Sequence, residues 1–244
     1  MLYVTYRWLL NNKKMGLDYL LVRSKKRKKT ISLQVKEDGT TIVYAPYRTP
    51  IGEIDKFFKE KKKWLWRKIE EREKKLKEIK QKEYLNGELF SYLGRPYQLK
   101  IEDKSDGCDS LTFSASAGQF VLLRDKVHQG RALFLEWYKK RSREYIEEIV
   151  NDYSQALGLN PSGLRISNAL CRWGSCSSNN NLSFSWRLIM APCSVIGYVV
   201  VHELAHIKEK NHSMRFWSIV AKTIPDYKKQ RLWLKENGHL LTAL

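Results

Sequence analysis

The segment His202-Glu203-Leu204-Ala205-His206 decides the fold and the chemistry that this 244-residue sequence predicts. Residues four positions apart lie on the same face of an α-helix, so His202 and His206 can hold one metal ion from one side. Glu203 follows the first histidine, and its carboxylate can reach a water molecule at that metal without being a ligand itself. Two imidazoles and a carboxylate at this spacing are typical of zinc hydrolases.

The residues around this segment predict a buried helix. Residues 196–201 are apolar almost all round the helix, and Leu204, Ala205 and Ile207 continue the pattern. A helix that is apolar on all sides lies inside a hydrophobic core. Polar side chains on such a helix need partners, and a metal ion would satisfy both imidazoles. We therefore expect a helix over residues 194–208 that carries two metal ligands. The alternative is a solvated helix face with two unrelated histidines.

His212 is the third candidate ligand. It lies six residues beyond His206, which corresponds to about 600° of helix rotation, so the helix must end between them. Asn211 tolerates the left-handed conformation that often closes a helix, and a chain that turns there can bring His212 to the metal. Three protein ligands plus water are the pattern of catalytic zinc sites. The alternative is a loop histidine that caps the next helix.

Further segments surround these histidines in a distinctive order. Arg172-Trp173-Gly174-Ser175-Cys176 comes first, H-E-L-A-H follows, and Asn211-His212-Ser213 then leads to Phe216-Trp217. This series closely resembles the YgjP-like zinc metallopeptidases, which are related to the SprT-like and WLM zinc peptidases. The resemblance extends from about Tyr19 to Gly238 and is densest from Arg172 onward.

The resemblance implies an enzyme that hydrolyses peptide bonds in protein or peptide substrates. It also implies that His202, His206 and His212 bind one zinc ion per chain and that Glu203 is the catalytic base. The spacing from His206 to His212 matches that of the metzincins as well, but Glu209 stands at their glycine position and no clear Met-turn follows. We therefore set the metzincin interpretation aside.

Substrate-binding residues are expected on the segments next to the motif. In zinc peptidases an extended substrate often pairs with an edge strand beside the motif helix. The strand at 182–188 is the candidate, with Arg187 near its end. Arg172 in the R-W-G-S-C loop is a candidate for shaping the site, and Tyr227 for donating a hydrogen bond to the oxyanion. The alternative for each is a structural role in a core strand, a locked loop or ordinary packing.

The net charge of +19 is concentrated in the first part of the chain. Residues 1–90 contain 24 Lys and Arg against 12 Asp and Glu, with dense clusters at 23–29 and 59–82. Such a surface suits DNA or another polyanion. In 59–82, however, glutamates alternate with lysines, which favours a salt-bridged exposed helix. The 23–29 cluster is therefore the better candidate for contact with a polyanion.

The remaining composition indicates a globular protein with reduced thiols. Cys108, Cys171, Cys176 and Cys193 form no C-x-x-C pair, so neither a disulfide framework nor a zinc finger is indicated. The apolar segment at 1–10 is interrupted by an arginine and lacks a cleavage signal, and no run reaches the length that spans a membrane. We therefore expect a cytoplasmic protein without membrane contact.

Hydrophobic patterning predicts an α+β fold, with a strand-rich N-terminal part joined to a helical zincin-like catalytic core with a small antiparallel sheet. The expected domains are a strand-rich basic region over 17–126 and a zinc metallopeptidase catalytic domain over 127–244. A turn at Asp38-Gly39 predicts a hairpin, and Gly158 is expected to end a long helix. Strands are expected over 19–22, 30–35, 41–45, 92–99, 111–113, 120–123, 164–167 and 182–186, and helices from Pro50, over 130–157, 194–208 and 213–223, and near Lys235.

Three functions remain open from the sequence. The first is a zinc-dependent metallopeptidase with Glu203 as general base. The second is a DNA-associated protease, which the basic N-terminal part and the SprT-like kinship suggest. The third is a non-enzymatic zinc-containing nucleic-acid-binding module. This last function would need a fourth protein ligand, such as Cys171 or Cys176, because structural zinc sites are closed by four.

Overall fold

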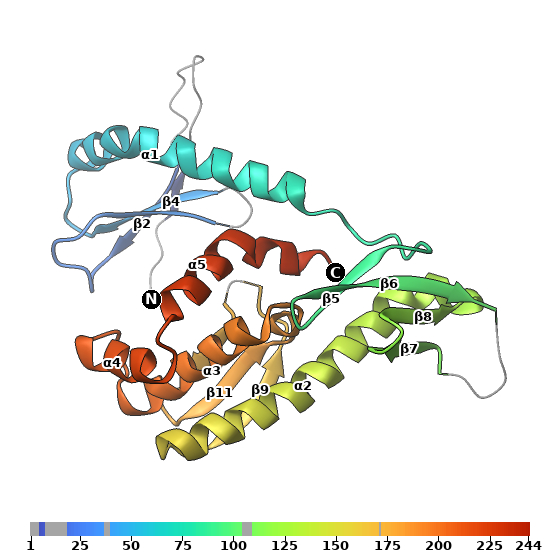
Figure 1. The fold of residues 1–244 in the computed structure, drawn as a ribbon. Helices are drawn as coiled ribbons and strands as arrows, with labels where there is room; N and C mark the ends of the chain where they lie inside the picture. Colours follow the sequence, from blue (N-terminus) through green and yellow to red (C-terminus); the bar gives the residue numbers. More distant parts are fainter. Residues whose placement is uncertain (1–4, 8–18, 37–39, 104–108, 171) are drawn as a thin grey trace. The chain divides into compact units, whose positions relative to one another are not determined.

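Apolar residues gather in two separate cores, and the chain divides accordingly into two units, residues 1–78 and 79–244. The computed structural model describes residues 5–7, 19–36, 40–103, 109–170 and 172–244 (Figure 1). The strands that follow residue 79 share the core of the C-terminal unit. The sequence predicts that the catalytic domain begins after residue 126, and this boundary stays a prediction.

The N-terminal unit consists of a four-stranded sheet and one long helix. The strands follow the order β1-β2-β4-β3, and β3 pairs antiparallel with β4, with Ser32 opposite Tyr44. This pairing confirms the predicted hairpin, whose Asp38-Gly39 turn lies outside the described residues. The elements are β1 (Thr5–Arg7), β2 (Leu20–Ser24), β3 (Ser32–Val35), β4 (Thr41–Pro46) and α1 (Ile51–Glu78).

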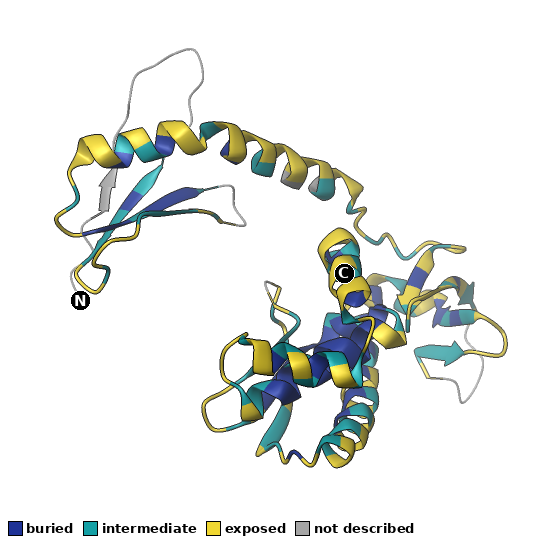
Figure 2. Ribbon diagram, turned by 60° about the vertical axis from the view of Figure 1, so that its left-hand side comes forward, coloured by how far each residue is buried: buried dark blue, intermediate teal, exposed yellow. Residues whose placement is uncertain are grey.

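The core of this unit lies between α1 and the sheet. Ile54, Phe58 and Leu65 of α1 pack with three sheet residues, Leu21, Val43 and Ala45. Figure 2 shows that most of the surface of α1 is exposed and that its buried positions are few. The lysines and glutamates that dominate the sequence of α1 occupy the exposed part, as the charge pattern predicts for a solvated helix face.

The C-terminal unit begins with a second four-stranded sheet, in the order β5-β6-β8-β7. The sequence predicts one strand over 92–99, and this prediction is wrong. The structure has a hairpin there, because Leu93 (φ 50°) and Gly94 (φ 77°) both adopt the left-handed conformation that a tight two-residue turn requires. The elements are β5 (Leu89–Tyr92), β6 (Arg95–Glu102), β7 (Leu111–Ser114), β8 (Gln119–Leu123), the 3₁₀ helix η1 (Arg124–Gln129) and α2 (Gly130–Leu157).

Helix α2 has the predicted bounds and connects this sheet to the rest of the unit. It ends at Gly158, whose left-handed φ of 62° closes the helix as expected. The ring of Phe134 on α2 stacks on that of Phe90 on β5, with centroids 4.0 Å apart. Phe120 on β8 lies 5.1 Å from the same ring. These aromatic contacts hold α2 against the sheet.

A three-stranded sheet precedes the motif helix, with β9 (Gly163–Ser167), β10 (Gly174–Cys176) and β11 (Asn181–Ser185) in the order β10-β11-β9. Three expectations are corrected here. The R-W-G-S-C segment contains a strand, β10, and is not only a loop. The sheet is mixed, because β11 runs parallel to β9 and antiparallel to β10. Since β11 is the central strand, the segment at 182–188 offers no free edge to a substrate.

The motif helix α3 (Cys193–Lys208) is buried, as predicted. Val199, Val200 and Val201 are all at most 4% exposed, so packing stabilises a β-branched run with low helix propensity. At Gly197 a β-carbon would lie only 3.1 Å from the hydroxyl oxygen of Tyr153, so glycine permits the close approach of α2. The 3₁₀ helix η2 (Trp186–Met190) precedes α3, and α4 (Met214–Thr223), α5 (Tyr227–Asn237) and the 3₁₀ helix η3 (Gly238–Thr242) follow it.

These elements confirm the predicted α+β class: the chain combines three small sheets with five α-helices in its described part. None of the helices there is both long and apolar enough to cross a membrane.

Candidate active site

The structure brings the three predicted histidines together. His202 and His206 lie one turn apart on α3, with ring centroids 5.1 Å apart. The ring of His212 lies 5.0 Å from the first and 4.8 Å from the second. One ring nitrogen from each residue can be chosen such that all three lie within 4.8 Å of one another. In the part of the chain that the structure describes, this is the group of side chains suited to a metal ion.

His212 reaches the site because the chain leaves the helix in an extended conformation. Helix α3 ends at Lys208, and Glu209 follows with φ −126° and ψ 101°. The predicted left-handed residue at Asn211 is wrong, since its φ is not positive. Ser213 then caps the N-terminus of α4, and its hydroxyl oxygen accepts a hydrogen bond from the backbone N–H of Phe216 at 3.3 Å. His212 is therefore fixed between two helix ends and does not cap the second one.

The donor atoms lie close enough together to bind one metal ion. Bonds of about 2.0–2.1 Å would place the ligand nitrogens roughly 3.3 Å apart. The Nε2 atoms of His202 and His212 are 3.0 Å apart. Nδ1 of His206 lies 3.0 Å from the carbonyl oxygen of Glu209, so this histidine can donate to the carbonyl and keep Nε2 for a metal. Such a partner on the outer nitrogen fixes the tautomer that a ligand needs.

The protonation states also favour a metal. Burial, assisted by the charges of His206 and His212, lowers the pKa of His202 to about 3. Burial also lowers the pKa of His206. Imidazoles must be neutral to bind a metal, and both pKa shifts favour the neutral form. Nδ1 of His202 is buried and has no hydrogen-bond partner within the described residues.

Glu203 lies on the buried side of α3 and is only 7% exposed. Burial raises the pKa of its carboxyl to about 7, against the opposing charge of Arg172 and a hydrogen bond donated by the backbone N–H of Cys176. A carboxyl with a pKa near neutrality can both take up and release a proton at physiological pH. Strand β10 therefore holds and tunes the side chain that the sequence identifies as the base.

Gly174 explains why the R-W-G-S-C segment contains glycine. A β-carbon at this position would lie 2.6 Å from Cγ and 2.7 Å from Oε1 of Glu203. Only glycine lets β10 approach the carboxylate this closely. The sequence shows the motif but not this contact, because residues 174 and 203 are far apart along the chain.

A row of aromatic rings adjoins the histidines. This aromatic row consists of Trp217 on α4, Tyr227 on α5 and Tyr198 on α3. Trp217 stacks on His212 at 5.7 Å and on Tyr227 at 5.2 Å, and Tyr227 lies 6.5 Å from Tyr198. The guanidinium of Arg231 lies over the Trp217 ring at 5.4 Å. Arg231 could not be predicted from the sequence, because nothing in its local pattern marks it.

The three predicted substrate-binding residues have different surroundings. Tyr227 belongs to the aromatic row, and the charge of Arg172 acts on Glu203. Arg187 instead stacks on Trp186 at 4.4 Å and donates to the carbonyl oxygen of Asn168 at 3.3 Å. Within the described residues, no contact joins Arg187 to the histidines. The role of all three in substrate binding stays a prediction.

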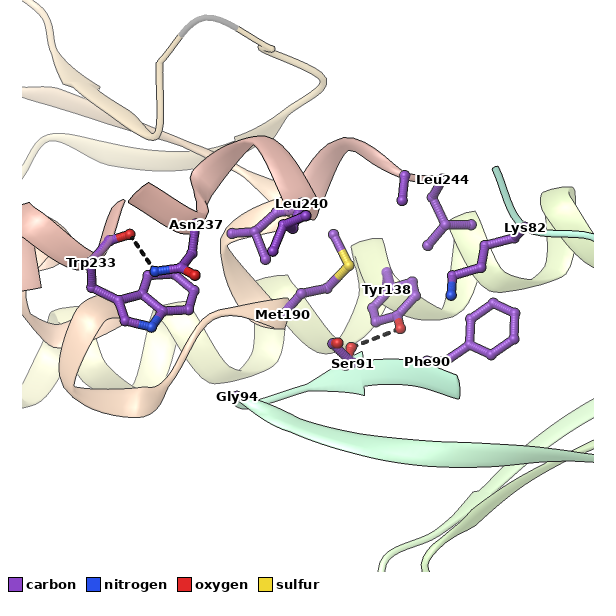
Figure 3. A pocket seen from close by; sticks show the side chains of 12 residues that line it. Lys82, Phe90, Ser91, Gly94, Tyr138, Met190, Trp233, Asn237, Leu240 and Leu244 are labelled. Atoms are coloured by element: carbon purple, nitrogen blue, oxygen red, sulfur yellow. Dashed lines mark hydrogen bonds between the residues drawn. The ribbon is translucent and has the colours of Figure 1, made fainter. Parts of the chain in front are cut away.

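A polar pocket lies beside the hairpin that holds Glu203. Its lining includes Arg165, Arg172, Ser175, Cys176 and Ser183, so the pocket lies on the small sheet that contacts Glu203. A different pocket lies where β5, α2 and the C-terminal helices meet (Figure 3). There Tyr138 donates a hydrogen bond to the carbonyl oxygen of Ser91 at 2.7 Å, and none of the site histidines takes part. None of the three histidines therefore lines this second pocket.

A fourth protein ligand is absent from the described residues around the histidines. Cys176 does not join the group of donor atoms. Its sulfur lies 3.9 Å from the ammonium of Lys210, which also donates to the side-chain oxygen of Asn180 at 2.7 Å. Cys171 and Cys108 lie outside the described part of the chain. The donor group found among the described residues therefore consists of the three histidines.

Comparisons with known proteins identify the family of the chain. The model of the YgjP-like family, described as a metallopeptidase domain, matches residues 29–237. No curated protein matches the chain.

Two solved structures are similar to part of it. The metallopeptidase zymogen abylysin of Pyrococcus abyssi is 23% identical, covers 37% of this chain and 93% of its own, and has a TM-score of 0.34. The metallopeptidase zymogen jannalysin of Methanocaldococcus jannaschii is 22% identical, covers 37% of this chain and 94% of its own, and has a TM-score of 0.35. Since the family model covers most of the sequence, the chain belongs to the YgjP-like metallopeptidase family.

Proposed function

We propose that this protein hydrolyses peptide bonds with one zinc ion per chain, held by His202, His206 and His212. The observation that carries this proposal is the convergence of three imidazole nitrogens within 4.8 Å beside a buried glutamate. A bound zinc ion supplies a Lewis acid that polarises the scissile carbonyl and makes water more acidic. The family membership supports a protein or peptide as substrate.

Glu203 is the general base in this proposal. Its carboxylate takes a proton from the attacking water and passes it to the amine that leaves when the C–N bond breaks. The raised pKa, about 7, suits both transfers. The N–H of Cys176 holds the carboxylate in place, and the nearby charge of Arg172 limits how far burial raises the pKa.

The free edge of β10 is the proposed site for an extended substrate. Among the described strands, β10 pairs only with β11. On its other edge the N–H of Cys176 already donates to Glu203, so a substrate would pair with the remaining main-chain groups of that edge. The backbone of this strand also contacts Glu203, so a peptide paired with it would lie beside the base. In this arrangement Arg172 contributes to substrate binding, and Tyr227 donates a hydrogen bond to the oxyanion.

The test is Glu203→Gln, which keeps the shape of the side chain but removes the base. We expect the variant to retain its metal and to hydrolyse an unstructured protein substrate at least about 100-fold more slowly. Glu236→Gln, an exposed position on α5, is the matched control and should keep full activity. Unchanged turnover in Glu203→Gln would show that another group is the base.

A second function, binding of DNA or another polyanion, is proposed for the N-terminal unit. The segment between β2 and β3 carries four exposed lysines, Lys25, Lys26, Lys28 and Lys29. The two arginines of this cluster have structural contacts instead. Arg23 donates to the carbonyl oxygens of Tyr47 and Thr49, and Arg27 donates to the hydroxyl of Ser32. The lysines are therefore the groups available to phosphates.

A further inference from the structure

Arg231 shares one face of α5 with a member of the aromatic row. Its guanidinium lies 5.4 Å from the ring centroid of Trp217, and Tyr227 stacks on the same ring at 5.2 Å. Residues 227 and 231 are four apart, so α5 presents both side chains to Trp217 on one face. Stacking on tryptophan fixes the plane of a guanidinium and favours its charge.

Trp217 places this arginine beside the histidines. The indole ring lies 5.7 Å from the ring of His212 and 5.8 Å from that of His202. The guanidinium and the His212 ring are therefore at most about 11 Å apart, a distance that roughly three or four residues of extended peptide span. A group bound by Arg231 would thus belong to the part of a substrate next to the scissile bond.

The charge of Arg231 is not matched by an acidic side chain. The residue is exposed, and it takes part in none of the ion pairs formed within the described residues. A cation next to a site built for a divalent metal is repelled by that metal. The arrangement becomes favourable when an anion binds between them.

We propose that Arg231, held against Trp217, forms a carboxylate-binding subsite for the peptide substrate. The proposal rests on the peptidase function above and specifies it, since it names substrates with a carboxylate close to the scissile bond. A guanidinium offers two parallel N–H donors that match the two oxygens of a carboxylate. The carboxylate comes either from an aspartate or glutamate side chain or from the C-terminus of the substrate.

The test compares peptides that differ only in one carboxylate. In one arm, acetylated and amidated octapeptides carry either Glu or Gln, moved through all eight positions. In the other arm, a peptide without acidic residues ends either in a free carboxylate or in an amide. Two readouts are used: kcat/KM for hydrolysis by the zinc-loaded enzyme, and Kd for binding to zinc-loaded protein that also carries Glu203→Gln.

The wild-type protein should prefer the carboxylate by roughly tenfold at one or two adjacent positions, or at the C-terminus. Arg231→Gln should abolish this preference, and Arg231→Lys should restore part of it, because lysine keeps the charge but not the planar donor pair. Lys229→Gln is the control. It removes the same charge from an exposed position about 200° around the same helix, and the preference should remain.

The arm that shows the preference identifies the source of the carboxylate. An equal preference in wild type and Arg231→Gln, or no preference in wild type by either readout, would overturn the subsite. A failure of the peptidase function can be distinguished from a failure of the subsite. If the protein is not a peptidase, none of the peptides is hydrolysed, but the Kd values still show whether Arg231 binds the carboxylate.

Discussion

At the residue scale, the proposed chemistry depends on the contact between Gly174 and Glu203. The two histidines and the glutamate of the motif could be predicted from the sequence, because helix periodicity alone places them. The contacts that surround these side chains could not be predicted. The N–H of Cys176 and the bare backbone of Gly174 reach Glu203 from a strand about thirty positions earlier, and Arg231 reaches the site from α5. Contacts between residues that are far apart in the sequence leave no local pattern from which they could be predicted.

Gly174→Ala is predicted to damage catalysis more than folding. The added β-carbon would lie 2.6 Å from Cγ of Glu203, so the carboxylate or the strand must shift. A misplaced base lowers kcat, and about a tenfold loss or more is expected while the metal stays bound. The comparison is with Gly52→Ala on α1, where nothing lies within 4 Å of the added carbon. Equal kcat values for the two variants would show that this contact has no catalytic importance.

At the element scale, the helices were more predictable than the short strands. The bounds of α2 follow from an apolar face and a closing glycine, and those of α3 from an uninterrupted apolar run. The strand expected over 92–99 was wrong because alternation alone does not reveal a turn at Leu93-Gly94. Strand β10 was missed because three residues are too few to show a period. Its pairing with β11 also decides which edge is free, and the sequence does not contain that information.

The turn between β5 and β6 supports the start of the motif helix. The N–H groups of Leu93 and Gly94 donate to the carbonyl oxygens of Ile189 and Met190 at 2.9 Å and 3.2 Å. A β-carbon on Gly94 would lie 2.7 Å from Cα of Pro192, the residue before α3. The sheet β5-β6-β8-β7 therefore braces the segment that leads into the motif helix.

Gly94→Ala is predicted to destabilise the protein by about 2–3 kcal/mol, because left-handed strain and a backbone collision act together. Gly118→Ala separates the two effects. Gly118 also has a positive φ of 65°, but nothing lies within 4 Å of its added carbon, so only strain of about 1 kcal/mol is expected. Thermal unfolding of both variants measures the difference. A Gly94 variant no less stable than the Gly118 variant would contradict the bracing contact.

At the scale of the whole molecule, the chain divides into an N-terminal unit rich in basic residues and a C-terminal unit that contains the HExxH helix. The position at which the two cores separate, after Glu78, could not be read from the sequence, since strands on both sides of it have similar patterns. The sequence also does not show that the arginines of the 23–29 segment make structural contacts while its lysines are exposed. This distinction comes from the hydrogen bonds of Arg23 and Arg27.

Replacing Lys25, Lys26, Lys28 and Lys29 together with glutamine is predicted to weaken DNA binding. Each lysine that contacts a phosphate contributes about 0.9 to the slope of log K against log salt, so the slope should fall by up to about 3–4. Fluorescence anisotropy with a duplex at several salt concentrations measures this change. Peptide hydrolysis should be unaffected. Binding with an unchanged slope would show that this segment does not contact DNA.

The central claim is that the three histidines hold a metal, and elemental analysis of the purified protein tests it most directly. The wild type should contain about one zinc per chain, and so should a His128→Ala control, whose histidine is exposed and lies outside the metal-binding group. His206→Ala should lose the metal. Zinc that stays at the wild-type level in His206→Ala, or a wild type that takes up none after incubation with zinc, would contradict the account.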